Sequence, residues 1–400
     1  MNRYYSLLRQ EHVLRQLSII QLISYFGAWF SNVAIYTLLI EMEVSASIIA
    51  LTAAMHFLPG VIQAPFSGVV IDRFEPKKVM LFLIVIEIIS TLMLLSISNE
   101  SHLPLLFVLI FFRMGASSFY FTLEMALLPR ILKVKQLQLA NEIHSIIWSL
   151  SYTVGMAISG FVVYKVGVSI AFVLDAILFL IALILLIRLS LHVKPNETTD
   201  NFIIMMRETF VYIVKNPLVL CLLILHAFIG MTAYDALVAL MVEQYYASII
   251  ATSLALGLMH ASRAVGLVLG PLLLGKYMTN KRLFYLLLFQ AFSLFLWAMV
   301  FENFYFSLMA SVVVGLGTTT LWSYTYTLLQ HNIDERFYGR VVAYNDMLFL
   351  LMAALTSLFI GFLSDHGVAL GAITLILGFG FIIAALFYLF VLKTFSLKDI

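Results

Sequence analysis

Residues 168–190 read VSIAFVLDAILFLIALILLIRLS, an apolar run that is interrupted by Asp175 and reaches its first basic residue at Arg188. An α-helix needs about 20 apolar residues to cross a bilayer, so this run is long enough. A strand of a membrane β-barrel would instead alternate polar and apolar residues, and this run does not. Because lipid offers the backbone no hydrogen-bond partners, the run predicts a transmembrane α-helix.

Eleven further runs of this kind lie along the rest of the chain. They cover residues 13–40, 46–71, 79–98, 104–129, 139–164, 216–241, 249–275, 283–301, 305–330, 341–364 and 369–392. The 400-residue chain is 63% hydrophobic and only 11% charged, against roughly 45–50% and about 25% in soluble proteins. The sequence therefore predicts an all-α integral membrane protein with twelve transmembrane helices.

Basic residues are distributed unevenly over the loops between these runs. If the N-terminus is cytoplasmic, 20 of the 23 Lys and Arg residues fall on cytoplasmic segments, and Lys165 is the one left in an external loop. Because cytoplasmic loops are enriched in basic residues, the pattern predicts a multi-pass protein of the cell (inner) membrane with both termini in the cytoplasm. The single cysteine, Cys221, excludes an internal disulfide.

A weak internal repeat divides the chain into halves. The segment 64–80 recurs as 270–284, and the longest polar stretch of the chain, at 190–200, lies between the two copies. The predicted parts are an N-terminal six-helix half at 1–190, a cytoplasmic linker at 191–215 and a C-terminal six-helix half at 216–400.

The end of this linker has an amphipathic pattern. At helical spacing, residues 202–216 place five apolar side chains near one face: Phe202, Met205, Met206, Phe210 and Ile213. Arg207 and Glu208 lie elsewhere on the helix. The pattern is typical of a helix on the cytoplasmic membrane surface. A plain extension of the seventh span is the alternative.

The loop between the second and third runs carries a recognisable motif. Gly68-Val-Val-Ile-Asp72-Arg73-Phe-Glu-Pro-Lys77-Lys78 resembles the G-x-x-x-D-R-x-G-R-[RK] signature of the major facilitator superfamily. Further fragments are Leu58-Pro59, Ala140-Asn141, Leu174-Asp175-Ala176, Asn216-Pro217 and Gly339-Arg340-Val341, and together they resemble the macrolide-efflux and siderophore-export branch. The resemblance implies the major facilitator fold of two pseudo-symmetric six-helix halves. The chain departs from the pattern at Ala28, where an acid is common in the first span.

The loop motif predicts a latch that closes the cytoplasmic side. Its residues are Gly68, Asp72, Arg73, Lys77 and Lys78, with Glu124 in the fourth span. Asp72 ends a span, where a carboxylate interacts favourably with the N-terminal end of another helix. In related carriers the loop cations pair with an acid near the cytoplasmic end of the fourth span, and the resemblance gives that place to Glu124. The alternative is that the loop cations only anchor the loop at lipid headgroups.

Charged residues inside the runs are the strongest pointers to function, because an ionisable group at the bilayer centre costs on the order of 2.5–3.5 kcal/mol. They are Arg113, Glu124, Asp235, Arg263 and Asp346, on spans that line the central cavity in the resembled family. We assign proton coupling to Arg113, Asp235 and Asp346, with Asp235 as the leading carrier and Glu124 as a second acid. Structural ion pairs are the alternative, and for Glu87 and Asp175 a structural role is favoured.

Aromatic and polar residues in the middle of spans predict a large apolar or aromatic substrate. The residues assigned to the substrate cavity are Tyr25, Trp29, Asn32, Trp148, His226, Arg263, Trp322, Tyr324 and Tyr326. Packing between helices is the alternative for each aromatic ring. The histidines His56, His144, His226 and His260 lack the i, i+3 or i+4 spacing of a metal site on one helix, so no metal site is predicted.

The sequence also excludes several classes of protein. The glycines Gly315 and Gly317 are not followed by the lysine of a phosphate-binding loop, so ATP is not the energy source. The chain has no nucleophile elbow or H-E-x-x-H motif, and its basic residues lie in short loops that do not suit nucleic acid. The expected partners are a small-molecule substrate, protons and membrane lipids, with no nucleotide, nucleic acid or cofactor.

Together these features predict a secondary active transporter, not an enzyme. It is expected to export an amphipathic organic compound, such as a drug, a macrolide-like compound or a siderophore, by proton-coupled alternating access. That activity would make it an antiporter that contributes to multidrug resistance. The main alternative is a proton-coupled importer of a nutrient or metal chelate, and an intramembrane enzyme ranks third.

Overall fold

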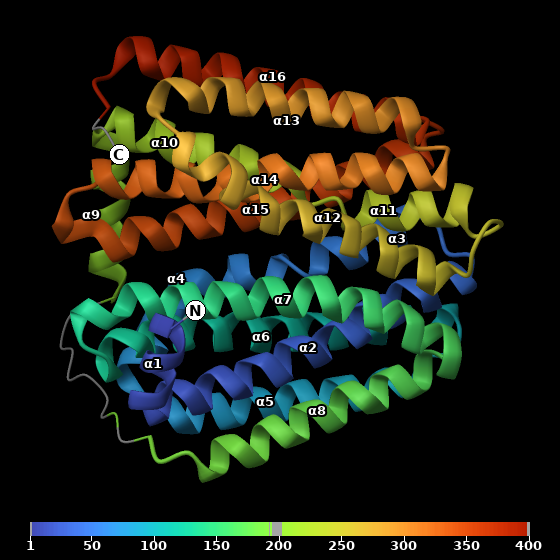
Figure 1. The fold of residues 1–400 in the computed structure, drawn as a ribbon, viewed down its shortest axis with the longest axis horizontal. Coiled ribbons are helices and arrows are strands. Elements are labelled where there is room, and N and C mark those ends of the chain that lie inside the picture. Colours follow the sequence, from blue (N-terminus) through green and yellow to red (C-terminus); the bar gives the residue numbers. More distant parts are fainter. Residues whose placement is uncertain (1, 192, 194–201, 398–400) are drawn as a thin grey trace. The chain divides into compact units, whose positions relative to one another are not determined.

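The computed structural model describes residues 2–191, 193 and 202–397, and the described residues form helices without strands (Figure 1). Twelve of its helical segments are long and apolar enough to cross a membrane. The prediction of an all-α protein with twelve membrane spans is confirmed. The predicted residues 194–201 of the linker lie outside the described part of the chain.

Contacts between Cα atoms divide the chain into two compact units. Unit 1 comprises residues 1–43 and 66–199, and unit 2 comprises residues 44–65 and 200–400. Residues 44–65 come from the second predicted span, so this grouping follows contacts and not chain order. The predicted division at residues 190 and 216 stays a prediction.

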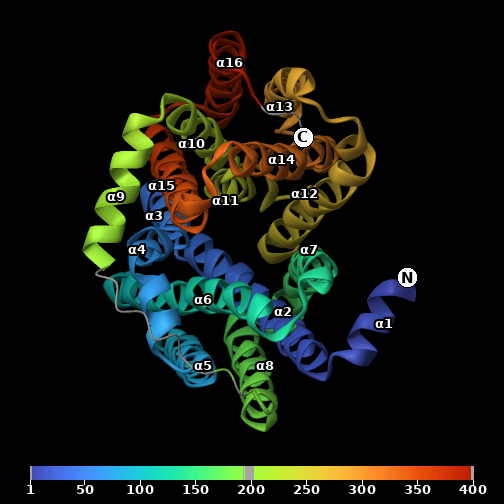
Figure 2. The same cartoon turned by 90° about the vertical axis from the view of Figure 1, so that its left-hand side faces the viewer.

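The helices of unit 1 are α1 (Asn2–Gln10), α2 (His12–Glu41), the end of α4 (Leu58–Arg73), α5 (Pro76–Met93), α6 (Leu103–Ile131), α7 (Val134–Val166) and α8 (Val168–Arg188). Short 3-10 turns follow α5 at Leu94–Ser96 and precede α6 at Glu100–His102. Helix α2 packs against α7 and α8, and α5 packs against α6 and α8 (Figure 2). Their shared core includes the fully buried Leu17, Met80, Leu123 and Phe179.

The helices of unit 2 are α3 (Ala46–Met55), the start of α4, α9 (Phe202–Lys215), α10 (Pro217–Ile229), α11 (Asp235–Met241), α12 (Thr252–Leu274), α13 (Asn280–Val300), α14 (Phe304–Asn332), α15 (Tyr338–Asp365) and α16 (Leu370–Thr394). Short 3-10 turns lie at Gly230–Thr232, Gly275–Tyr277 and Glu335–Phe337, and a π-helix lies at Val242–Tyr246. Helix α12 packs on α14, α13 packs on α16, and α3 packs on α15.

Helices α12 and α14 cross at unusually short range because glycines line the crossing. A Cβ atom added at Gly266 would contact the Val312 carbonyl and come within 2.8 Å of the Gly315 Cα. A Cβ at Gly315 would in turn meet the Arg263 carbonyl and lie 3.0 Å from the Gly266 Cα. Glycines allow two membrane helices to approach closely, which strengthens van der Waals contact between their backbones.

Two predicted spans are not continuous helices. The seventh span, expected at 216–241, breaks after Ile229 into the 3-10 turn Gly230–Thr232 and resumes as α11 at Asp235. The second span, expected at 46–71, turns at residues 56–57 between α3 and α4. The two apolar runs predicted the spans but not these breaks, because hydrophobicity reports membrane depth and not backbone continuity.

Helix α9 is a separate helix and not an extension of the seventh span, because Asn216 and Pro217 interrupt the chain between α9 and α10. Ile213 is buried, as expected for the apolar face, whereas Phe210 is exposed. The amphipathic role of this segment at the membrane surface stays a prediction. The Arg340 guanidinium donates to the Met205 carbonyl at 3.3 Å and lies 3.7 Å from Glu208, so α9 is tied to the start of α15.

Candidate functional site

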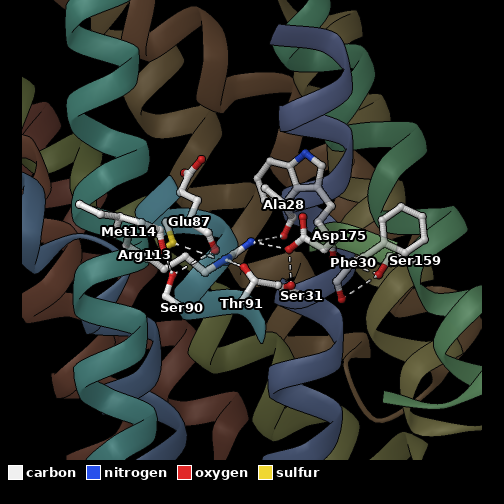
Figure 3. A network of polar contacts seen from close by, with 12 residues as sticks. Ala28, Phe30, Ser31, Glu87, Ser90, Thr91, Arg113, Met114, Ser159 and Asp175 are labelled. Atoms are coloured by element: carbon white, nitrogen blue, oxygen red, sulfur yellow. Dashed lines mark hydrogen bonds and ion pairs between the residues drawn. The ribbon is translucent and has the colours of Figure 1, made fainter. Parts of the chain in front are cut away.

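The most completely connected polar group in unit 1 is an ion pair inside the helices. Arg113 on α6 donates from Nη2 to Asp175 Oδ2 on α8 at 2.9 Å, and both side chains are almost fully buried. Arg113 also donates from Nε to Thr91 Oγ1 at 3.1 Å and from Nη2 to the Ala28 carbonyl at 3.2 Å (Figure 3). Four helices thus contribute to one buried network.

The first span shapes this network in two ways. Ser31 donates its hydroxyl proton to Asp175 Oδ2, which gives that oxygen a second partner. Gly27 leaves the space that the carboxylate occupies, since a Cβ there would lie 2.8 Å from Asp175 Oδ1. Ala28, which stands where the resembled family commonly has an acid, contributes its carbonyl, and the carboxylate comes instead from the sixth span.

Arg113 therefore has its counter-charge, the Asp175 carboxylate, within the same unit. The sequence favoured a structural role for Asp175, but it did not predict that Asp175 pairs with Arg113. A signal was available, because a buried arginine and a buried aspartate in neighbouring spans each need a partner of opposite charge. The assignment of Arg113 to proton coupling stays a prediction.

The predicted latch residues are only partly described. Gly68 and Asp72 lie in α4, but their side chains are outside the described set, so the structure says nothing of their contacts. Arg73 is exposed, Lys77 donates to the Ile187 carbonyl at 2.9 Å, and Lys78 pairs with Glu75 at 2.8 Å. The partners of Lys77 and Lys78 are thus the Ile187 carbonyl and Glu75, and the latch role of the loop stays a prediction.

Glu124 lies deep inside unit 1 on α6. Its Oε2 atom is 3.9 Å from His144 Nδ1 on α7, and the amide of Gln21 on α2 lies 2.6 Å from the same nitrogen. The latch role of Glu124 stays a prediction, but its neighbours in this conformation are a histidine and an amide.

In unit 2, His226 on α10 lies at the centre of an aromatic cluster. Its ring centroid is 5.8 Å from Trp322, 5.5 Å from Tyr326 and 5.6 Å from Phe349. Trp322 and Tyr326 are one turn apart on α14 and stack at 4.9 Å. We call these four residues the His226 cluster. Three of them were predicted from sequence, and Phe349 on α15 was missed because one more phenylalanine in an apolar run carries no signal.

The hydrogen bonds around His226 assign its tautomer. Thr325 Oγ1 donates to the Leu321 carbonyl at 2.8 Å, so its lone pairs face His226 Nδ1, which lies 2.8 Å away. Because a hydroxyl has one proton to donate, this arrangement favours the tautomer in which Nδ1 carries the hydrogen and donates. The other ring nitrogen, Nε2, is then an acceptor, and it is buried with no hydrogen-bond partner. A buried acceptor of this kind is costly unless a ligand or water completes it.

Of the other predicted residues of unit 2, Asp346 lies near this cluster, whereas the Tyr324 hydroxyl contacts another helix. Asp346 on α15 is an electrostatic neighbour of the Tyr326 hydroxyl and so belongs to the border of the cluster. The Tyr324 hydroxyl instead donates to Asn280 Oδ1 at 2.9 Å, at the start of α13. The structure does not bring Tyr324 to the His226 cluster.

A second polar group of unit 2 surrounds the break in the seventh span. Arg263 on α12 donates to the Thr232 carbonyl at 2.7 Å, and its guanidinium lies 5.0 Å from the Tyr234 ring centroid. Asp235 Oδ1 is 3.8 Å from His260 Nδ1. Asp235 therefore lies beside a histidine, while Arg263 covers backbone freed by the break.

The aromatic residues predicted in unit 1 form a group of their own. Trp29 on α2 meets the Tyr152 ring edge-on at 4.7 Å, and Trp148 on α7 stacks on the same ring at 5.4 Å. Asn32 is buried on α2, and Tyr25 lies edge-on to His144 at 6.2 Å. Within the described residues, no three His, Cys, Asp or Glu side chains are grouped as metal ligands.

Comparison with known proteins gives a consistent result. The family model described as Major Facilitator Superfamily matches residues 17–349. Macrolide efflux protein A of Streptococcus pyogenes is 24% identical over 334 residues, which are 80% of this chain and 82% of that protein. The protein of the same name from Enterococcus faecalis is 25% identical over 300 residues, 72% of this chain and 92% of that protein.

Other similar proteins have different or undefined roles. The uncharacterized MFS-type transporter YkuC of Bacillus subtilis (strain 168) is 27% identical over 213 residues, and the match spans 50% of either chain. The nucleoside transporter NupG has a TM-score of 0.73 at 13% identity, covering 96% of this chain and 100% of that chain. The POT family transporter PepTSo has a TM-score of 0.73 at 11% identity, with 95% and 98% covered. At these identities the solved structures show the shared fold.

Proposed function

This chain belongs to the major facilitator superfamily and is a transporter, not an enzyme, and from that premise we propose that it exports an amphipathic organic compound by proton-driven alternating access. Its similarity to two macrolide efflux proteins favours a drug or macrolide-like compound as the substrate. Export of such a compound against its gradient in exchange for protons would make the chain an antiporter that lowers drug sensitivity.

The observation that carries this proposal is the His226 cluster. Its rings offer flat apolar surfaces, and Nε2 of His226 offers one unused acceptor among them. Binding sites for drug-sized molecules combine such apolar walls with a few polar groups that fix orientation. The cluster therefore suits a mostly apolar molecule that carries a hydroxyl or protonated amine donor.

Proton coupling is assigned to buried acids of the two units. In unit 2, Asp346 borders the His226 cluster, which supports a link between its proton and substrate binding, and Asp235 lies beside His260 as the second acid of this unit. In unit 1, Arg113 is held by Asp175 and acts on proton coupling through that pair. Tyr324 is left out of the proposed substrate site.

We place the chain in the cell (inner) membrane with both termini cytoplasmic, because basic residues gather in the loops expected on that side. In a Cys221→Ser background, Asn99→Cys and Asn303→Cys should react with a membrane-impermeant maleimide added to intact cells. Thr279→Cys, in a loop of the opposite side, should react only after the cells are opened. Labelling of Thr279→Cys in intact cells would reverse the proposed orientation.

The function is tested by expressing the chain in a host that lacks its own drug exporters. We expect lower accumulation of a macrolide and of an amphipathic dye than in the empty-vector strain, and restored accumulation when a protonophore is added. Higher accumulation in the expressing strain would indicate import, and equal accumulation of all compounds at normal protein abundance would reject drug export.

A further inference from the structure

A small cavity inside unit 1 is bordered by groups that bind and release protons. It lies between α2, α5, α6 and α8, and its walls include Glu87, Ser117, Tyr25 and Tyr120. Its size is about that of one water molecule, and water is held in such a place when several polar groups face it. The cavity therefore has the room and the lining to hold one bridging water.

Among the described residues, two buried polar atoms of this region have no hydrogen-bond partner: the Tyr120 hydroxyl, which lines the cavity, and Glu124 Oε2 farther along α6. The Tyr25 hydroxyl, which also lines the cavity, has the Gln21 side chain as its hydrogen-bonding neighbour. Both Glu87 and Glu124 are electrostatic neighbours of both tyrosine hydroxyls. Buried polar atoms normally have a hydrogen-bond partner. A water molecule, or a proton shared between two of these groups, would provide one.

The charges that face the two glutamates do not balance. Glu87 faces Arg113 of α6 and Asp175 of α8, with Ser117 as a hydrogen-bonding neighbour. In Figure 3 the carboxyl end of Glu87 points away from the Arg113–Asp175 pair, and its side chain makes none of the contacts drawn. Glu124 faces His144 of α7. One arginine thus stands against the carboxyl groups of Asp175, Glu87 and Glu124.

A buried carboxylate without a counter-charge is strongly unfavourable, so protons must make up this difference. Arg113 forms its ion pair with Asp175, at 2.9 Å. We therefore expect the carboxyl groups of Glu87 and Glu124 to bind the protons. The two acids lie on neighbouring helices, α5 and α6. Glu87 lines the cavity, and the hydroxyls of Tyr25 and Tyr120 in the same lining are electrostatic neighbours of both acids.

We propose that Glu87 and Glu124 form a two-carboxyl proton site in unit 1, joined through one water in the cavity and the hydroxyls of Tyr25 and Tyr120. Once Glu124 has released its proton, a proton that leaves the Glu87 carboxyl binds the water, the water passes one of its own protons to a tyrosine oxygen, and that tyrosine gives its hydroxyl proton to the Glu124 carboxylate. One proton moves in total: the water and the tyrosine end with the atoms that they began with, Glu87 ends as a carboxylate and Glu124 as a carboxylic acid. The site deepens the proposed function, since it supplies protons to the transport cycle from a unit other than that of the His226 cluster.

The proposal is tested by infrared difference spectroscopy on the purified chain in lipid vesicles, which needs no transport substrate. A pH step should produce protonated-carboxyl signals, of which Glu87→Gln removes one and Glu124→Gln removes another. Each single variant should also shift the signal of the other acid, because the two groups share one water. The exposed Glu100→Gln is the matched control and should leave both signals in place.

The bridging groups are tested in the same way. Tyr25→Phe combined with Tyr120→Phe should uncouple the two signals, so that neither responds to loss of the other, whereas the exposed Tyr164→Phe should change nothing. Glutamine is neutral and nearly the size of glutamate, and a monodisperse elution profile verifies that the variants are folded. Absence of both signals in the wild type, or signals that stay fixed in folded Glu87→Gln and Glu124→Gln, overturns the proposal. Since the spectra do not depend on export, a negative drug-accumulation result leaves this test unaffected.

Discussion

Replacing Asp175 with asparagine should remove most of the folded transporter from the membrane. The change leaves the Arg113 guanidinium buried among α2, α5, α6 and α8 without its carboxylate, while Thr91 and Ala28 can offer it neutral acceptors only. Removing one partner of a buried ion pair costs about 3–5 kcal/mol. We expect loss of export and a membrane abundance several-fold below the wild type, measured by quantitative immunoblot. The exposed Glu100→Gln is the matched control and should behave as wild type.

A double variant separates stability from transport at this pair. Arg113→Met with Asp175→Leu removes both charges together, and replacing a buried pair by apolar side chains of similar volume is often neutral for stability. We expect abundance to return while export stays absent, because Arg113 and Asp175 then no longer face Glu87. Full export by the double variant would show that the pair serves only to hold the helices together.

Replacing His226 with phenylalanine should weaken substrate binding without unfolding the chain. The ring keeps its contacts to Trp322, Tyr326 and Phe349, but the Nε2 acceptor is lost. A hydrogen bond contributes about 0.5–1.5 kcal/mol, and about 1.4 kcal/mol is a tenfold change in binding. We expect the substrate concentration for half-maximal export to rise by up to about tenfold, measured from initial rates of dye efflux.

Two further variants define what the His226 result means. His226→Gln keeps an acceptor near the same place and should lie between the wild type and His226→Phe. Tyr324→Phe changes an aromatic residue of the same helix that is bonded to Asn280, so its half-maximal concentration should stay at the wild-type value. A larger change in Tyr324→Phe than in His226→Phe would place the substrate on the other side of α14.

The fold was predictable to the level of spans. The number of membrane helices follows from hydrophobic length alone, since lipid requires each crossing segment to satisfy its own backbone. The breaks at Gly230–Thr232 and at residues 56–57 were not predictable in the same way. Both breaks lie inside apolar runs. Hydropathy describes the side chains of a run and not its backbone conformation, so it does not reveal where the helix stops.

The candidate site was predictable in its residue types but not in its pairings. Arg113, His226 and Trp322 stood out because polar or aromatic residues in mid-span are uncommon. The partners Asp175 and Thr325 did not, because the helix-to-helix contacts that select them are set by tertiary packing. The grouping of Asp235 with His260 instead of Arg263 has the same origin, since Arg263 is drawn to the free Thr232 carbonyl.

The break in the seventh span divides it into two helical segments that need not move as one rigid body. In an unbroken helix, every turn transmits bending and twisting to the next through its ladder of hydrogen bonds. Between Ile229 and Asp235 that ladder is replaced by a 3-10 turn and by the bond from Arg263 to the Thr232 carbonyl. The segment carrying His226 and the segment starting at Asp235 can therefore tilt by different amounts, while Arg263 ties the turn between them to α12.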